Sequence, residues 1–331
     1  MTRRKLDWNK RMIWIIFLLF KVVASVEDTR RPIWNVAHMV NSLRQVDYYL
    51  DKGANSLEFD VAFDWQGNPK FTFHGVPCDC FRTCMRYENI DTFIEYLRLV
   101  TTPGNLNYRE ELVLLMMDLK IRGLAPEYLK LAGENMAKKL LDLYWKHGKS
   151  GARAYVLLSM PSVNHIDLIR SFQQVLYAEN ATFYKQKIGF DFSDNEDLNI
   201  IHSVLDNVQV SSQIWQGDGI TNCLPRGIRR LQDAIYRRDY MKSQFVSKVY
   251  WWTVDKMSTM RRTLSLGVDG MITNHPHRLV EVLNEPEYSS FARLANIKDI
   301  PWSKHPINEN SISRMDNFTA LDVEEEILYN S

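Results

Sequence analysis

Short apolar runs alternate with longer amphipathic runs along most of the chain. The strand-like runs are Ile33–His38, Ser56–Phe63, Lys70–His74, Leu112–Leu119, Arg153–Met160, Lys187–Phe192, Ser212–Trp215, Lys248–Val254 and Gly270–Thr273. Stretches with apolar positions at helical spacing lie between most of them: Val40–Lys52, Asp91–Val100, Pro126–Lys146, Val163–Glu179 and Lys256–Leu266. This repeated alternation predicts a mostly parallel sheet covered by helices, an α/β fold.

The number of strand–helix units favours a single (β/α)8 TIM barrel over a doubly wound sheet, since about eight units occupy about 250 residues. No glycine-rich phosphate loop of the G-x-G-x-x-G or G-x4-G-K-[ST] type follows any of the runs, which removes the main reason to prefer a nucleotide-binding fold. The active site of such a barrel is expected at the C-terminal ends of its strands.

Both ends of the chain differ from this pattern. A basic region, MTRRKLDWNKR, precedes the apolar run MIWIIFLLF and the small residues Ala24 and Ser25, which is the layout of a secretory signal peptide. The apolar run is shorter than the ~20 residues of a membrane helix. We therefore expect a signal peptide at 1–25, with an uncleaved anchor as the alternative, the barrel at 26–302, and a polar, acidic, disordered extension at 303–331.

The charge distribution bears on the kind of partner. Of 41 Lys/Arg and 40 Asp/Glu residues, the first 25 positions hold six bases and one acid, which leaves 35 bases and 39 acids afterwards. A net acidic remainder argues against nucleic acid as the main partner. Nothing in the sequence indicates a stable protein partner, so we expect a secreted monomer.

Export would allow the cysteines to form disulfides and two sequons to be glycosylated. Four cysteines, Cys78, Cys80, Cys84 and Cys223, favour disulfides in an oxidising compartment, and the spacing leaves all three pairings open. A zinc site is the rival, although Cys-x-Cys-x3-Cys is not a common ligand spacing. Asn180-Ala-Thr and Asn317-Phe-Thr are glycosylation acceptors.

Paired acids interrupt the apolar run Ser56–Phe63. Glu58 and Asp60 share one face of this strand because successive side chains point to opposite faces. Two carboxylates inside a barrel repel each other and lose hydration, which is unfavourable unless a cation lies between them. The alternative is a solvated strand end that holds two acids.

Asp118 and Lys120 share a face at the end of the next apolar run. A third carboxylate with open positions for water and phosphate suits Mg²⁺, a hard cation that prefers oxygen ligands. Lys120 either contacts a phosphoryl oxygen or simply neutralises Asp118.

Two of the eight histidines, His38 and His74, end strand-like runs and are therefore expected at the mouth of the barrel beside the acids. A pair of imidazoles serves as general base and general acid near neutral pH. Cleavage of a phosphodiester needs such a pair together with a cation for the charge on phosphorus. A structural role for both histidines is the alternative.

Tyr250 and Trp252 share a face of a late strand, and Asp255 and Asn274 follow the last two strand-like runs. A Trp at a barrel mouth packs on a quaternary ammonium through cation–π attraction. Trp and Tyr are also ordinary core residues, and their spacing does not separate the two interpretations.

These residues lie in segments that resemble the spider-venom phospholipase D family, also called sphingomyelinase D or dermonecrotic toxin, within the glycerophosphodiester phosphodiesterase superfamily. The resemblance runs from about Arg31 to Trp302 and rests on RRPIWNVAHMVN, GANSLEFDVAFD, FHGVPCDC, TTPGN, LVLLMMDLK, WQGDGITNCLPRG, WWTVDK and GVDGMITNHP. It implies a (β/α)8 barrel.

The resemblance also implies roles for particular residues. The catalytic histidines fall on His38 and His74, and the ligands of one Mg²⁺ fall on Glu58, Asp60 and Asp118. The phosphate-side lysine falls on Lys120, and the substrate-pocket residues fall on Tyr250, Trp252, Asp255 and Asn274. The implied disulfides are Cys78–Cys84 and Cys80–Cys223.

The activity that the resemblance implies is release of the head group, choline or ethanolamine, from sphingomyelin and lysophospholipids at a membrane or lipoprotein surface. The lipid's own hydroxyl attacks phosphorus and gives a cyclic phosphate. A phosphodiesterase for small soluble glycerophosphodiesters and a catalytically silent lipid-binding barrel are the alternatives. Two positions depart from the family pattern: Ala37 stands for Gly, and Phe59 stands for Thr on the outward face of its strand.

Overall fold

The computed structural model describes residues 28–208, 210, 212–241 and 246–306. The predicted signal peptide at 1–25, the sequon at Asn317 and residues 307–331 of the predicted extension lie outside this range. The described residues fall into two units, which divide between Arg30 and Arg31. In the first unit, the Arg30 side chain donates to Asp28 Oδ1 over 2.9 Å. The helices and strands belong to the second unit.

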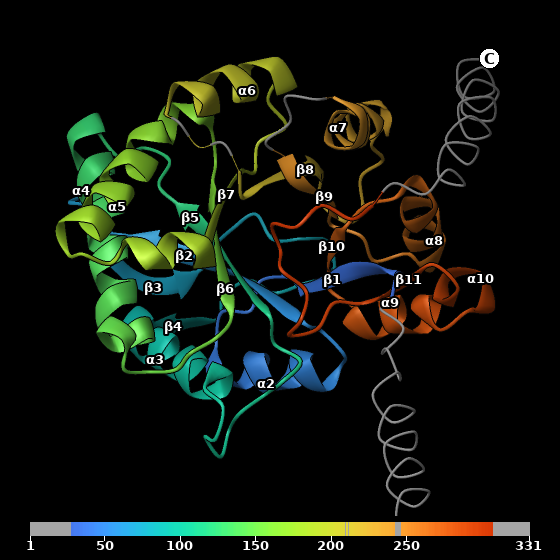
Figure 1. Cartoon of the computed structure of the whole chain (residues 1–331), viewed down its shortest axis with the longest axis horizontal. Helices are drawn as coiled ribbons and strands as arrows, with labels where there is room; N and C mark the ends of the chain where they lie inside the picture. The colour runs from blue at the N-terminus through green and yellow to red at the C-terminus, as the bar shows by residue number, and fades with distance from the viewer. Residues whose placement is uncertain (1–27, 209, 211, 242–245, 307–331) are drawn as a thin grey trace, which may run out of the picture. The chain divides into compact units, whose positions relative to one another are not determined.

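Eight parallel strands form a closed ring, as the sequence predicts (Figure 1). In ring order they are β1 (Arg31–Ala37), β2 (Ser56–Phe63), β5 (Leu114–Lys120), β6 (Tyr155–Met160), β7 (Ile188–Phe192), β8 (Ile214–Gly219), β9 (Val246–Trp252) and β10 (Gly270–Thr273). The ring closes because β1 pairs in parallel with both β2 and β10. The fold is therefore the (β/α)8 TIM barrel.

Helices surround the ring (Figure 1). They are α2 (Leu43–Asp51), α3 (Ile90–Thr101), α4 (Pro126–Lys139), α5 (Ile166–Ala178), α6 (Leu198–Asn207), α7 (Arg229–Tyr240), α8 (Met257–Leu266), α9 (Pro276–Leu283) and α10 (Pro286–Ser289), with short helical segments at Leu140–Trp145, Lys146–Gly148, Val163–His165 and Thr182–Lys187. Within the described ranges, no helix combines the length and the apolar character needed to cross a membrane.

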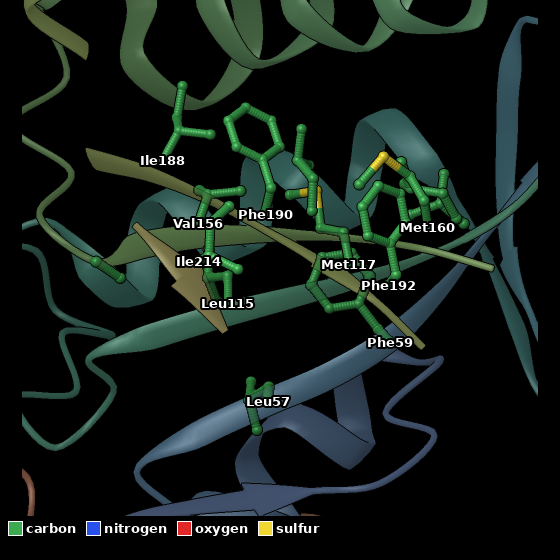
Figure 2. Packing of buried hydrophobic residues seen from close by; sticks show 14 of the residues in the cluster. Leu57, Phe59, Leu115, Met117, Val156, Met160, Ile188, Phe190, Phe192 and Ile214 are labelled. Atoms are coloured by element: carbon green, nitrogen blue, oxygen red, sulfur yellow. The ribbon is translucent and has the colours of Figure 1, made fainter. Parts of the chain in front are cut away.

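The outward faces of the strands form the main core. Figure 2 shows side chains of β2, β5, β6, β7 and β8 packed together beneath the surrounding helices. Phe59 belongs to this layer, as the alternation of β2 predicts, and its ring centre lies 4.9 Å from that of Phe93 in α3. A substitution at Phe59 therefore acts on packing between strand and helix and not on the inward face of β2.

The run Lys70–His74 is not a barrel strand, and here the prediction was wrong. It forms β3 (Pro69–Phe73), which turns back along β2 in antiparallel pairing and continues to a short edge strand, β4 (Tyr87–Asn89). The pattern could not show this because a hairpin strand and a barrel strand have the same alternation. His74 still reaches the mouth, since β3 begins opposite Phe63, the last residue of β2, and runs back only a short way, with Thr72 opposite Val61.

The opposite end of the barrel is closed by a buried charge cluster and by the last described residues. Asp269 Oδ1 accepts from Arg31 over 3.1 Å, and Asp269 Oδ2 is paired with Arg238. Lys248 Nζ lies 3.6 Å from Asp269 and donates to the carbonyl of Ser303 over 2.6 Å. The short strand β11 (Ala292–Leu294) pairs with β1 beside this base. The first residues after 302 thus contact the barrel.

Candidate active site

Three carboxylates converge at the C-terminal ends of β2 and β5. Asp60 and Asp118 are register partners in the parallel pairing of these strands, so both side chains reach the same level of the barrel. Glu58, two residues earlier on the same face, completes a group in which one carboxylate oxygen from each residue lies within 4.8 Å of the other two. Glu58 and Asp60 are buried.

The surroundings of these acids hold them in place. Asn41, in the loop after β1, donates to Asp60 Oδ2 over 2.6 Å and accepts from the Asp60 backbone over 3.0 Å. The backbone N–H of Met39 donates to Glu58 Oε2 over 2.7 Å. Lys120 Nζ lies 2.7 Å from Asp60 Oδ1 and 2.6 Å from Asp118 Oδ2. One ammonium therefore faces three carboxylates.

The pKa values of Glu58 and Asp60 reflect the close placement of the three carboxylates and Lys120. Burial, reinforced by the charge of Asp60, raises the pKa of Glu58 to about 8. Burial also acts to raise the pKa of Asp60, but the Lys120 ammonium outweighs it and the pKa is lowered. Full ionisation of the three acids would thus need a positive charge beyond that of Lys120, which is the condition that favours a bound cation.

These residues fit a divalent metal ion. All three offer carboxylate oxygens, which hard cations prefer, and burial raises the pKa of Glu58, so a cation beside it would favour its charged form. Glu58, Asp60 and Asp118 would hold the ion. Zinc at the cysteines, the rival interpretation, does not apply because all four cysteines are in disulfides.

His38 follows β1 directly and points toward the acids. Its Nε2 lies 3.9 Å from Glu58 Oε2, and its Nδ1 lies 3.0 Å from Asp79 Oδ2 and 3.1 Å from Asn274 Oδ1. An Nδ1–H that donates to Asp79 leaves Nε2 facing the site. Burial alone would lower the pKa of His38, but the hydrogen bond to Asp79 and the charge of Glu58 raise it above its ordinary value.

His74 faces His38 across the mouth. The two ring centres are 6.3 Å apart and the planes are nearly perpendicular. His74 Nδ1 lies 2.7 Å from the carbonyl oxygen of Gly75, so an Nδ1–H donates to it and Nε2 is left for the site. Both imidazoles therefore present the same ring nitrogen, and the structure brings together all five residues of the expected acid and histidine core.

The loop between β3 and β4 approaches His38 from the other side. Two disulfides hold this loop, Cys78–Cys84 within it and Cys80–Cys223 to the loop after β8, which are the pairs that the family resemblance implies. Between these cysteines, Arg82 donates to the His38 carbonyl oxygen over 2.9 Å and to Tyr49 Oη over 3.0 Å, and it also contacts Asn274 Oδ1.

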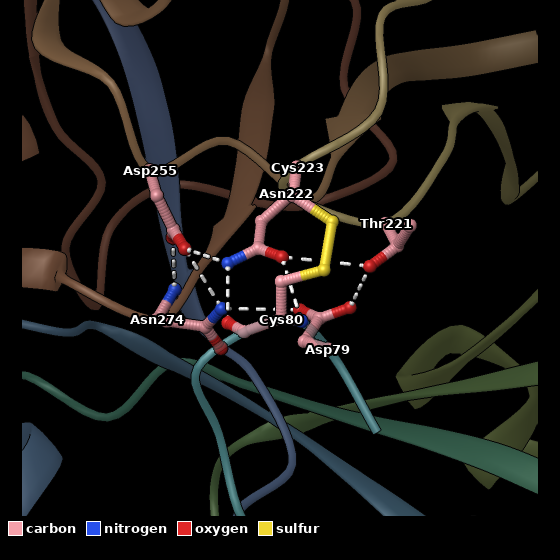
Figure 3. The surroundings of a disulfide bond; sticks show 7 residues. All are labelled: Asp79, Cys80, Thr221, Asn222, Cys223, Asp255 and Asn274. Atoms are coloured by element: carbon pink, nitrogen blue, oxygen red, sulfur yellow. Dashed lines mark hydrogen bonds between the residues drawn. A yellow bond between two sulfur atoms is a disulfide. The ribbon is translucent and has the colours of Figure 1, made fainter. Parts of the chain in front are cut away.

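Asp255 and Asn274 belong to a hydrogen-bond network around the second disulfide (Figure 3). Asp255 accepts from the Asn274 and Asn222 side-chain amides over 2.9 and 2.8 Å. Asp79 accepts from Thr221 over 2.7 Å and from Asn274 over 3.0 Å. These two predicted pocket residues thus join β9, β10 and two loops behind His38.

Tyr250 and Trp252 both face the barrel interior, as predicted from alternation, but their surroundings differ. Tyr250 is fully buried and donates to Asp191 Oδ2 over 2.7 Å, whereas Trp252 is half-buried at the end of β9. Burial raises the pKa of Asp191 to about 6. A Cβ on Gly217 would lie 2.6 Å from the Tyr250 ring, so this ring position requires glycine on β8.

Sequence reasoning missed four residues: Asn41, Asp79 and Arg82 contact the core, and Asp191 accepts from Tyr250. Asp191 had a signal, because it is an acid on the inward face near the end of a strand, the rule that identified Glu58 and Asp60. Asp79 lies between two cysteines, but its position beside His38 can be inferred only when the disulfide pairing of those cysteines is known. Arg82 and Asn41 had no signal, since each acts from a loop.

Among the sequons, Asn180 lies on the surface after α5, and both it and Thr182 are exposed. The position is accessible to modification in an exported chain.

Comparison with solved structures places the barrel in a known fold class. A glycerophosphodiester phosphodiesterase from Parabacteroides distasonis superimposes with a TM-score of 0.51 at 14% identity, over 77% of this chain and 98% of that one. At this identity the likeness concerns the fold alone.

Sequence comparison is more specific. Residues 28–302 match the family described as dermonecrotic toxin SPH. A dermonecrotic toxin of Loxosceles cf. spinulosa is 49% identical over 82% of this chain and 99% of its own length, and one of Sicarius terrosus is 49% identical over 84% of this chain and 100% of its own. The chain belongs to the dermonecrotic toxin family.

Proposed function

We propose that this protein is a secreted, Mg²⁺-dependent enzyme of the phospholipase D type that releases the head group from sphingomyelin and lysophospholipids. One observation carries the proposal: two imidazoles 6.3 Å apart face each other beside three carboxylates within 4.8 Å. A phosphodiester placed there meets a base, an acid and a site for a cation at once. Two disulfides and membership of a toxin family support secretion.

The two histidines divide the proton transfers. One imidazole takes the proton of the lipid's hydroxyl as its oxygen bonds to phosphorus, and the bond from phosphorus to the head-group oxygen breaks. The other imidazole, protonated beforehand, gives its proton to that leaving oxygen. The products are a cyclic phosphate and the free alcohol of the head group.

The remaining residues orient and neutralise. Glu58, Asp60 and Asp118 would hold one Mg²⁺, which when bound draws negative charge from the phosphoryl oxygens. Lys120 supplies a fixed positive charge at the same edge, and Asp79 holds the His38 ring through Nδ1. Trp252, half-buried at the end of β9, is placed to contact a head-group ammonium.

The decisive experiment identifies the phosphorus-containing products of the reaction. The protein is incubated with sphingomyelin, lysophosphatidylcholine or soluble glycerophosphocholine, each with Mg²⁺ or with EDTA, and the products are read by ³¹P NMR. We expect a cyclic phosphate from the two lipids with Mg²⁺ only. Turnover of glycerophosphocholine alone would replace the proposal with a soluble phosphodiesterase, and no turnover would leave a lipid-binding barrel.

Matched variants test the roles of the residues. His38→Ala and His74→Ala are expected to abolish release, while His147→Ala, at an exposed histidine paired with Asp142, is expected to have no effect. Calorimetric titration with Mg²⁺ gives a second readout without turnover. Equal Mg²⁺ binding by the wild type and by Asp118→Asn would contradict the assigned ligands.

A further inference from the structure

Phe81 combines two features that are rarely found together. Its side chain is 103% exposed, and its backbone φ is +65°, in the left-handed region that a bulky side chain seldom adopts. Nothing in its own burial compensates this conformation. The surrounding loop imposes it, because Cys78–Cys84 and Cys80–Cys223 hold the chain on both sides of Phe81.

Other apolar side chains on the same two loops are also exposed. Val76 is 80% exposed and Met85 is 61% exposed on the loop of Phe81, and Leu224 is 54% exposed next to Cys223. The Cys80–Cys223 disulfide and two hydrogen bonds between Asn222 and Cys80 join the loops that carry them. Exposed apolar side chains gathered on a rigid support mark an interaction surface.

The charges on this surface indicate what it meets. The only acid from Phe71 to Tyr87 is Asp79, which is buried against His38. Arg86 is exposed in the same segment, and residues 220–228 contain no acid. Aromatic and aliphatic side chains with a cation and without exposed carboxylates suit the head-group region of a bilayer, whose phosphates are anionic.

The side chains of the loop Cys78–Cys84 point in two directions, toward the site and toward solvent. Asp79 and Arg82 point inward and contact His38, whereas Phe81 between them points to solvent. A surface that receives Phe81 therefore lies next to the histidine that acts on the phosphodiester. We propose that Phe81, with Val76, Met85 and Leu224, inserts into a lipid bilayer and docks the barrel mouth on it. This inference rests on the proposed function for its choice of a lipid surface as the partner.

The test measures binding to vesicles without turnover. The full chain is mixed with phosphatidylcholine–sphingomyelin vesicles in EDTA, and bound protein is separated by sedimentation. Phe81→Gly removes the side chain and fits the positive φ without strain, so the variant is expected to fold. Its partition coefficient should fall by about 10-fold, as expected for losing one buried aromatic side chain.

Leu106→Gly is the matched control. Leu106 is also 103% exposed, but it lies in the loop before β5, at the opposite end of the barrel from the site. Its loss should change the partition coefficient by less than about 2-fold, the usual size for a side chain that makes no contact. Phe81→Trp should restore binding, and brominated lipids should quench its added indole fluorescence beyond that of the wild type.

Each outcome is decisive. Equal losses in Phe81→Gly and Leu106→Gly, or no vesicle binding by the wild type, would overturn the inference and leave a soluble protein as the occupant of this surface. Vesicle binding that depends on Phe81 supports it. Because binding is measured in EDTA, failure of head-group release in the NMR experiment would count against the proposed function and not against this surface.

Discussion

The two ends of this barrel each contain a cluster of buried charges, but the clusters are balanced differently. At the mouth, three carboxylates face one ammonium, and the pKa of Glu58 is raised to about 8 by burial and by Asp60. At the base, Asp269 is surrounded by Arg31, Arg238 and Lys248, and its pKa is lowered far below its usual range because these cations outweigh its burial.

This difference separates a functional site from a structural one. The base is complete, since protein cations pair its acid and the Ser303 carbonyl accepts from Lys248. At the mouth, three acids share the one ammonium of Lys120, so ionising all three would need a further cation. Removing an acid should therefore have opposite consequences for stability at the two ends, and the following predictions test that contrast.

The largest effect is expected for Glu58→Gln at the mouth. Loss of a metal ligand should lower the rate of head-group release on the order of 10³-fold. The free energy of unfolding without Mg²⁺ should stay equal or rise, because a repelled carboxylate is removed. Rates by ³¹P NMR and urea denaturation in EDTA measure both. A marked loss of stability would show that the mouth is as well balanced as the base.

Asp269→Asn at the base should do the reverse. Breaking this buried ion cluster should lower the free energy of unfolding by about 3 kcal/mol, since Arg31 and Lys248 keep their charges without this partner and Arg238 keeps only Asp239. Urea denaturation measures it. The activity per folded molecule should not change, because Asp269 lies at the far end of the strands. A loss of activity in the folded fraction would contradict the separation of the two ends.

Arg82 tests whether the loop around the mouth positions His38. Replacing Arg82 by Met removes the hydrogen bonds to the His38 carbonyl and to Tyr49. We expect kcat to fall by about 10- to 100-fold with little change in KM, because a misplaced acid–base group slows the chemical step more than binding. Arg82→Lys should recover part of the rate. A change confined to KM would indicate that Arg82 contacts substrate instead.

The smallest effect concerns pH at the base. Burial lowers the pKa of Lys248 to about 8 from 10.5, so between these values the unfolded chain binds the proton that the folded chain has lost. Stability should therefore rise with pH, by about 1.5 kcal/mol from pH 8 to 9.5. Lys248→Met should lack this rise. Parallel pH profiles for wild type and variant would show that Lys248 keeps its proton in the fold.

Alternation within strands predicts many of the residues at the mouth. Glu58, Asp60 and Asp118 follow from the rule that every second residue shares a face, and the order of strands and helices predicts that these faces meet inside a barrel. Tyr250 and Trp252 follow from the same rule. The rule is local, so a sequence suffices for it.

Alternation does not predict the part of the site that the loops form. Alternation predicts His74 at the mouth as the end of a barrel strand, whereas the pairing with β2 shows that its run is the return strand of a hairpin. The contacts of Asp79 and Arg82 with His38 bring residues together from distant parts of the chain, and no periodicity encodes such contacts.

Alternation, element order and shared segments are properties of the amino-acid sequence, and they suffice to predict the barrel, the inward acids and the family. That His38 and His74 face each other, that Asp79 orients one of them and that Phe81 is exposed beside them became known only from the fold. These facts depend on loop conformations held by disulfides and by contacts across the ring. The contacts that stabilise these arrangements join residues far apart in the chain, so no local sequence pattern predicts them.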